Sequence, residues 1–217
     1  MASRSLLIMK KNNIFWNNFY KKFNLNLPSG FAKFILKNKY FNKGHILDVG
    51  CGNGRDTFYF LKFGYKIIGI DKSSTAVKLN KKILPNNFFK ANICSKKFNI
   101  NSITNKKIMN IYARFFIHAI NTKEQFYFFK NLRKISSKNI KIFLEFRTIK
   151  DPMMRYGKKI TENERISDHY RRFINVREIQ NELKNLGYKI LYKKESFNFA
   201  KFKNQKPHIC RMILISR

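Results

Sequence analysis

This chain alternates between short apolar runs and longer segments with helical periodicity. The apolar runs, which are short enough for strands buried on both faces, are residues 46–49, 67–70, 87–91, 108–112 and 140–146. The intervening segments, which have apolar residues at helical spacing, are residues 57–63, 74–84 and 122–135. Strands that alternate with helices in this way predict a mostly parallel sheet.

The two ends of the chain extend this pattern. Further helices are predicted, from aromatic and apolar residues at helical spacing, at 14–22, 31–40 and 176–186. Two final apolar runs predict a closing antiparallel hairpin at 188–194 and 209–216. Residues 150–173 show weak periodicity and many charges, and we predict that they form an active-site insertion. The predicted fold is therefore α/β, with a Rossmann-like, mostly parallel seven-stranded sheet, helices on both faces and an antiparallel C-terminal edge hairpin.

The strongest chemical pattern follows the first predicted strand. Gly50, Gly52 and Gly54 allow the backbone to turn sharply and to approach a ligand closely, because glycine has no Cβ. Asp71 ends the second predicted strand, where an acid can accept hydrogen bonds from a ribose diol. Together these residues predict one half of a nucleotide-binding α/β sheet.

Residues 46–54, Ile-Leu-Asp-Val-Gly-Cys-Gly-Asn-Gly, resemble the first motif of the class I S-adenosylmethionine-dependent methyltransferases. A dinucleotide dehydrogenase would show its glycines in the spacing G-x-G-x-x-G. Here the glycines alternate and an acid, Asp48, stands just ahead of them, which is the methyltransferase form. The spacing from this motif to Asp71 also fits the family.

The resemblance implies the cofactor S-adenosyl-L-methionine and a set of residues that hold it: Asp48, Gly50, Cys51, Gly52, Asp71, Asn92 and Arg114. Residues 50–52 would lie against the methionine part, Asp48 would orient its amino group, and Asp71 would take the ribose hydroxyls. Asn92 stands where family members often have an acid that contacts adenine, and its amide oxygen can accept the same hydrogen bond; a plain turn residue is the alternative. Arg114 would lie near the cofactor carboxylate or an anionic substrate, or else form a surface ion pair.

The resemblance also implies a layout for the chain, which at 217 residues fits one domain. We expect a single methyltransferase domain over residues 1–217. Its expected parts are an N-terminal helical cap, a cofactor-binding core, an active-site insertion, and a C-terminal helix with a hairpin, at residues 1–43, 44–147, 148–174 and 175–217.

Three further segments, residues 112–120, 145–148 and 169–173, resemble methyltransferases found in bacterial surface-polysaccharide gene clusters. This resemblance implies O-methylation of a small-molecule or glycan-type acceptor. The candidate substrate-binding residues are Glu145, Arg147, Tyr170, Arg171 and Arg172. The guanidinium groups of Arg171 and Arg172 suit a phosphate or a carboxylate. Glu145 and Arg147 can also pair with each other.

Two histidines are candidates for the general base that an oxygen acceptor needs. His118 follows the fourth predicted strand, at the edge of the sheet where ligands bind, and its pKa range suits proton transfer. His169 lies in the predicted insertion. A histidine packed among aromatic residues can equally be a core residue, so both interpretations stay open here.

The net charge of +34 favours a second function, RNA methylation, because Lys and Arg neutralise phosphates. Compositional drift is the competing explanation, since the lysines are spread along the chain and are not gathered in one patch. The position after the fourth strand reads Tyr-Ala-Arg-Phe at 112–115, so the Asn-Pro-Pro-aromatic pattern of many amino methyltransferases is missing. Ribose methylation remains open.

The three cysteines, Cys51, Cys94 and Cys210, are too widely spaced for a zinc site or a disulfide framework. We therefore expect a reducing, cytoplasmic location and no metal. The first seven residues faintly resemble an organellar transit segment, although acids are scarce throughout this chain. No apolar run is long enough for a membrane span. The sequence indicates nothing about oligomeric state.

Overall fold

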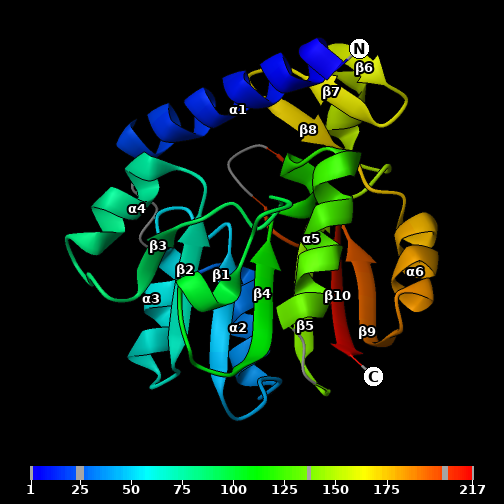
Figure 1. Ribbon diagram of the computed structural model, residues 1–217. Coiled ribbons are helices and arrows are strands. Elements are labelled where there is room, and N and C mark those ends of the chain that lie inside the picture. The colour runs from blue at the N-terminus through cyan, green and yellow to red at the C-terminus, as the bar shows by residue number, and fades with distance from the viewer. Residues whose placement is uncertain (1, 23–26, 136–137, 202–204, 217) are drawn as a thin grey trace.

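A seven-stranded sheet forms the centre of the computed structural model, which describes residues 2–22, 27–135, 138–201 and 205–216 (Figure 1). The strands are β1 (His45–Val49), β2 (Ile67–Asp71), β3 (Phe88–Lys90), β4 (Ile108–Arg114), β5 (Lys141–Arg147), β9 (Tyr188–Ser196) and β10 (Ile209–Ser216). Their order is β3-β2-β1-β4-β5-β10-β9, with β10 antiparallel to both of its neighbours and the other pairs parallel. The predicted fold class, including the antiparallel edge hairpin, is confirmed.

Helices cover both faces of this sheet because neighbouring strand residues point in opposite directions. Ile46 packs with Phe31 of α2 (Gly30–Lys37) and Phe60 of α3 (Arg55–Lys62) on one face. Leu47, the next residue, belongs to the cluster on the other face, which includes apolar residues of α5 (Thr122–Ile135) and α6 (Val176–Asn185). Helix α4 (Ser74–Lys81) contacts β2 and β3 at the sheet edge. Short 3-10 turns lie at Ile100–Ser102, Ile117–Ala119 and Pro152–Arg155.

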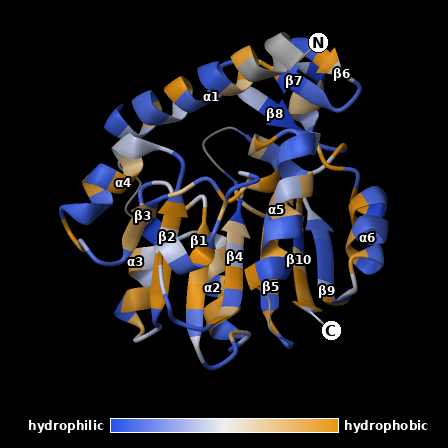
Figure 2. Cartoon of the chain, in the orientation of Figure 1, coloured by the Kyte–Doolittle hydropathy of each residue, from blue (hydrophilic) through white to orange (hydrophobic). Residues whose placement is uncertain are grey.

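Helix α1 (Ala2–Lys22) crosses above the carboxyl ends of the parallel strands (Figure 1). It begins well before the predicted start at residue 14, because its first half lacks the apolar periodicity that marked the second half. Figure 2 shows hydrophobic residues along the central strands and mixed hydrophobic and hydrophilic residues along α1. In the described ranges, no helix combines the length and the apolar character needed to cross a membrane.

The segment at 150–173 contains a second, three-stranded antiparallel sheet that the sequence reading did not predict. Its strands are β6 (Lys158–Thr161), β7 (Glu164–Ile166) and β8 (Tyr170–Arg172), in the order β6-β7-β8. Strands of three or four residues that are rich in charge carry almost no periodic signal. This small sheet packs against α1 through β8 and so supports the helix above the main sheet (Figure 1).

Candidate active site

A cavity of about 470 Å³ lies at the carboxyl ends of β1, β2 and β4, beneath α1. This is the edge of an open α/β sheet at which ligands bind, because the strand order reverses there and leaves a crevice. Trp16, Phe19 and Tyr20 of α1 line the cavity from above. Its size suits a nucleotide-sized ligand together with a small partner group.

The glycine turn after β1 forms one wall of this cavity. Gly50, Gly52 and Gly54 all have positive φ angles, of 70°, 54° and 73°, a conformation that other residues rarely adopt. A Cβ at Gly50 would lie 2.7 Å from a ring carbon of Phe116. A Cβ at Gly52 would lie 2.5 Å from the hydroxyl oxygen of Tyr20. The turn therefore requires glycine for both its backbone angles and its close packing.

Asp71 stands at the tip of β2 and faces the glycine turn. Its Oδ2 accepts a hydrogen bond from the backbone N–H of Gly52 at 2.9 Å, and its Oδ1 accepts one from the N–H of Ser73 at 2.7 Å. Burial raises the pKa of Asp71, while these backbone N–H groups act in the opposite direction. The side chain is thus fixed in orientation, with lone pairs left for a ligand.

Asp48 lies beneath the turn and is buried. Its Oδ2 accepts a hydrogen bond from the hydroxyl of Thr57. Burial raises the pKa of Asp48 to about 8, because a carboxylate loses its hydration there. Asn92 lies farther along the cavity, and its Oδ1 accepts a hydrogen bond from the N–H of Cys94 at 3.1 Å.

The structure brings the predicted cofactor-binding residues together along this one cavity: Asp48, Gly50, Cys51, Gly52, Asp71, Asn92 and Arg114. The local motif was sufficient to locate the residues at 48–71, because the turn and the ends of β1 and β2 lie close together in sequence. Which cofactor group each residue contacts stays a prediction.

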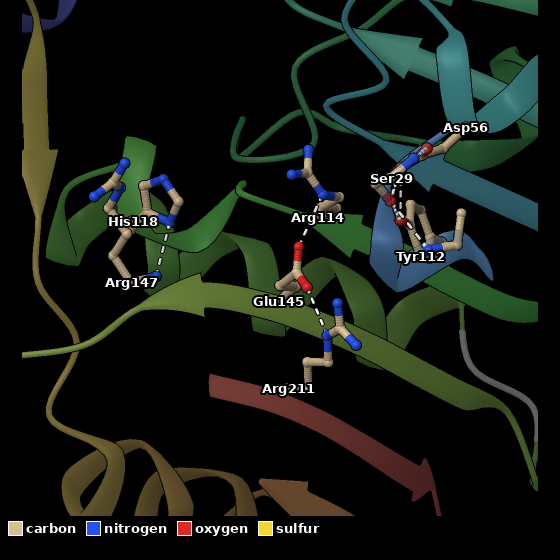
Figure 3. Close-up of polar contacts among 9 residues, drawn as sticks. Ser29, Asp56, Tyr112, Arg114, His118, Glu145, Arg147 and Arg211 are labelled. Atoms are coloured by element: carbon tan, nitrogen blue, oxygen red, sulfur yellow. Dashed lines mark hydrogen bonds and ion pairs between the residues drawn. The ribbon is translucent and has the colours of Figure 1, made fainter. Parts of the chain in front are cut away.

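The two predicted histidines are placed elsewhere. His118 is buried, and its Nδ1 accepts a hydrogen bond from the backbone N–H of Arg147 at 3.2 Å (Figure 3). Burial lowers the pKa of His118 well below its usual value. His169 stacks against Phe15, with ring centroids 4.3 Å apart, and its Nδ1 lies 3.1 Å from Oδ2 of Asp168. Neither imidazole is among the residues that line the cavity in the described part of the chain.

The predicted substrate-binding residues separate into two groups. Arg147 lines the cavity, while its Nη1 donates to Asp151 at 2.8 Å. Glu145 is fully buried and lies behind the cavity wall. The other three contact different partners: Tyr170 bonds to Glu164, Arg171 pairs with Asp168 at 2.6 Å, and Arg172 bonds to Gln125 and to the carbonyl of Ile117. These contacts involve the small sheet, and none of the three side chains lines the main cavity.

A hydrogen-bonded group that the sequence reading missed lies at the cavity wall opposite the nucleotide side. Asp56 accepts hydrogen bonds from the N–H of Ser29 at 2.7 Å, from the Ser29 hydroxyl at 2.7 Å and from the Tyr112 hydroxyl at 2.7 Å (Figure 3). All three residues are buried and line the cavity. They come from the start of α2, the start of α3 and strand β4. A sequence signal existed only in the Arg55-Asp56 pair directly after the glycine turn.

Residues 41–139 match the family model of a methyltransferase domain. Just under half of the chain is therefore similar to a methyltransferase domain. A curated relative, protein 235L of Invertebrate iridescent virus 6, which is named as a methyltransferase, is 34% identical over 98 residues. That alignment covers 43% of this chain and 34% of the viral protein, so this chain matches about a third of its relative's length.

Several solved structures share the fold of this chain. A S-adenosylmethionine-dependent methyltransferase of Anabaena variabilis superposes with a TM-score of 0.73 at 19% identity, covering 94% of this chain and 93% of that one. One from Methanosarcina mazei gives 0.71 at 16% identity, over 83% and 96%. The glycopeptide N-methyltransferase MtfA gives 0.66 at 14% identity, over 89% and 97%, and has been solved with S-adenosylmethionine and with S-adenosylhomocysteine. The chain therefore shares its fold with these methyltransferases.

Proposed function

We propose that this protein is an S-adenosylmethionine-dependent methyltransferase that methylates an oxygen atom of a small-molecule or glycan-type acceptor. The observation that carries the proposal is the cavity built from the glycine turn and Asp71, within the segment that matches a methyltransferase domain. When bound, S-adenosyl-L-methionine supplies a methyl group that is already activated on a sulfonium.

The residues present fit this cofactor. Gly50 and Gly52 leave the turn without side chains on the cavity wall, so that a ligand can lie against the backbone. Asp71, held by two backbone N–H groups, offers fixed acceptors for a ribose diol. Asp48 offers a carboxylate for an ammonium group, and Asn92 offers an amide for the base.

Helix α1 covers the cavity, and this cover supports a small acceptor. Trp16, Phe19 and Tyr20 of α1 form its upper wall, and Phe15 and Trp16 of the same helix pack on His169 of the insertion. A folded polynucleotide would have to displace this helix to reach the turn. The main task of the protein is then to hold the acceptor oxygen in line with the methyl group, which is catalysis by proximity and orientation.

A hydroxyl acceptor also has to lose its proton, and Asp56 is placed to take it. Its carboxylate accepts the Tyr112 hydroxyl proton at the cavity wall, so Tyr112 can receive a proton from the acceptor while passing its own to Asp56. Tyr112→Phe would keep the ring packed against Phe31 and Phe60 and remove the relay. We expect this substitution to lower kcat more than it changes the affinity for the cofactor.

RNA remains the second candidate because of the net charge of +34. The test uses purified protein with S-adenosylmethionine carrying a tritiated methyl group, supplied separately with total RNA, with a small-metabolite fraction and with a surface-glycan fraction. Label in the metabolite or glycan fraction supports the proposal. Label in RNA alone overturns it in favour of the second candidate. An Asp71→Ala control identifies label that depends on the cavity.

A cytoplasmic location is part of this proposal. The free cysteines of the described chain, Cys51, Cys94 and Cys210, are all buried, as thiols kept in a reducing compartment can be.

A further inference from the structure

The walls of the cavity differ in charge. On the side of β1 and β2 the lining includes the acids Asp48 and Asp71, while Lys72 directly after β2 is paired with Glu124 at 3.7 Å. On the side of α3, β4 and β5, and of the connection between β9 and β10, it includes four cationic side chains: Arg55, Arg114, Arg147 and Lys201. We call this second side the basic wall. Of its members, Arg114 at the end of β4 is also one of the predicted cofactor-binding residues.

Two arginines share one carboxylate behind this wall. Glu145 is fully buried and accepts hydrogen bonds from Nε of Arg114 at 2.8 Å and from Nε of Arg211 at 2.7 Å. Figure 3 shows the terminal nitrogens of Arg114 pointing away from Glu145. The pairing therefore uses Nε and leaves the outer edge of the Arg114 guanidinium directed toward the cavity that it lines.

The positive charge of Arg55 is less compensated by paired carboxylates than the charges of Arg114 and Arg147. It opens α3 directly after the glycine turn, is half-buried, and forms no hydrogen bond or ion pair with any residue that the structure describes. Burial and the nearby charge of Arg114 both lower the pKa of Arg55. Two guanidinium charges thus stand near each other in a partly desolvated place, which is unfavourable without an anion.

The neighbouring carboxylates compensate the charge of Arg55 only in part, because burial and Arg114 outweigh the opposing effect of Asp56 on its pKa. Asp56 adjoins Arg55 in sequence, but its oxygens accept the Ser29 and Tyr112 hydrogen bonds. Asp151 is paired with Arg147 at 2.8 Å, so Arg147 is already neutralised. Counting Arg211 with the wall, five cationic side chains face three carboxylates, which leaves an excess positive charge. S-adenosyl-L-methionine cannot remove this excess, because its sulfonium and ammonium outnumber its one carboxylate.

We propose, building on the methyl-transfer function above, that the acceptor carries an oxyanion, either a carboxylate or a phosphate, which Arg55 and Arg114 bind together at the basic wall. Guanidinium groups offer planar pairs of N–H donors that match both kinds of oxyanion. The anion anchors the acceptor at this wall, and the acceptor's hydroxyl then lies between the wall and the nucleotide side. The substrate class is a small hydroxylated acid or a phosphate monoester.

Anion binding to the protein saturated with S-adenosylhomocysteine tests the proposal. Phosphate and malonate are the probes, titrated in separate arms at constant ionic strength with chloride, with the melting temperature as the readout. Arg55→Gln is the test variant. Lys62→Gln is the matched control, since it removes the same charge from the exposed last turn of the same helix.

We expect Arg55→Gln to weaken binding of the more tightly bound probe at least tenfold, because hydrogen bonds to charged groups are lost. Lys62→Gln should change the affinity for the same probe less than twofold. Arg55→Lys keeps the charge and loses the planar donor pair, so its anion affinity should lie between those of the two Gln variants. This variant replaces Arg55→Gln in the test if Arg55→Gln does not fold. The arm with tighter binding distinguishes carboxylate from phosphate.

Two results would overturn the proposal. Equal losses in the Arg55 and Lys62 variants would mean a general charge effect. A tenfold loss of S-adenosylhomocysteine affinity in Arg55→Gln, with anion binding unchanged, would assign the arginine to the cofactor carboxylate. Failure of the wild type to bind S-adenosylhomocysteine would instead contradict the proposed function, and it is measured separately by calorimetry before any anion is added.

Discussion

The pKa of Asp48 leads to a measurable proton release when the cofactor product binds. Burial raises this pKa to about 8, so that about 0.9 of the Asp48 side chains carry a proton at pH 7 in the free protein. An ammonium group placed against Asp48 would favour the charged carboxylate and return its pKa toward the usual range. Binding of S-adenosylhomocysteine at pH 7 should therefore release about 0.9 proton per site.

Isothermal titration calorimetry in two buffers of different ionisation enthalpy, Pipes and Tris, measures this number directly. Asp48→Asn keeps an oxygen for the Thr57 hydroxyl and removes the titrating group, so its proton release should fall close to zero. Wild-type binding without proton release would refute the placement of the ammonium at Asp48. Equal release by the variant would show that another group titrates.

The same pKa fixes the direction of a stability effect. The folded-state pKa of Asp48 lies above its unfolded value of 3.8, so between about pH 4 and pH 8 the folded protein holds a proton that the unfolded chain has lost. This group's contribution is therefore most favourable at low pH and declines as the pH rises through that window. Urea denaturation of wild type and Asp48→Asn at pH 5 and pH 8 should show a steeper loss of stability with pH for the wild type, and parallel curves would contradict this.

Three other substitutions test the structure of the site. Asp71→Ala should weaken S-adenosylhomocysteine binding by about 10- to 100-fold in calorimetry, since two charge-assisted hydrogen bonds to the ribose are lost, and an unchanged affinity would exclude its assigned role. Gly50→Ala should lower the melting temperature more than Gly64→Ala. Both glycines have a positive φ, but only a Cβ at residue 50 would meet another side chain. Equal shifts in melting temperature would mean that packing at Gly50 does not matter. Glu145→Gln should reduce the free energy of unfolding by about 3–5 kcal/mol, as its two arginines lose their buried counter-ion. Glu162→Gln, at an exposed residue, is its control. Similar urea midpoints for the two variants would contradict the stabilising role of the buried pairing between Glu145 and its two arginines.

The sequence indicated which residues line the cavity beside β1 and β2 because that part of the cavity is local in sequence. Strand β1, the glycine turn and the tip of β2 lie within residues 45–71, and each has a distinct pattern of apolar residues, glycines and a terminal acid. The register of β1 against β2 then brings Asp71 to the turn. No contact between distant segments had to be known.

The proposed acceptor side could not be predicted in the same way because distant segments build it. Ser29, Asp56 and Tyr112 meet at one point, although 83 residues separate the first from the last. His118 follows β4 as expected, but the 3-10 turn Ile117–Ala119 directs its ring to the backbone of Arg147. Periodicity shows which residues face a core, yet it cannot show which of two buried directions a turn residue takes.

Equilibrium dialysis with tritium-labelled S-adenosylmethionine tests the central claim most directly, because it needs no knowledge of the acceptor. We predict saturable binding of one cofactor molecule per chain by the wild type, and much weaker binding by Asp71→Ala under conditions where circular dichroism shows the variant to be folded. Absence of binding by the folded wild type up to about 1 mM cofactor, the upper end of usual KM values, would contradict the claim. Equal binding by the two proteins would contradict it as well.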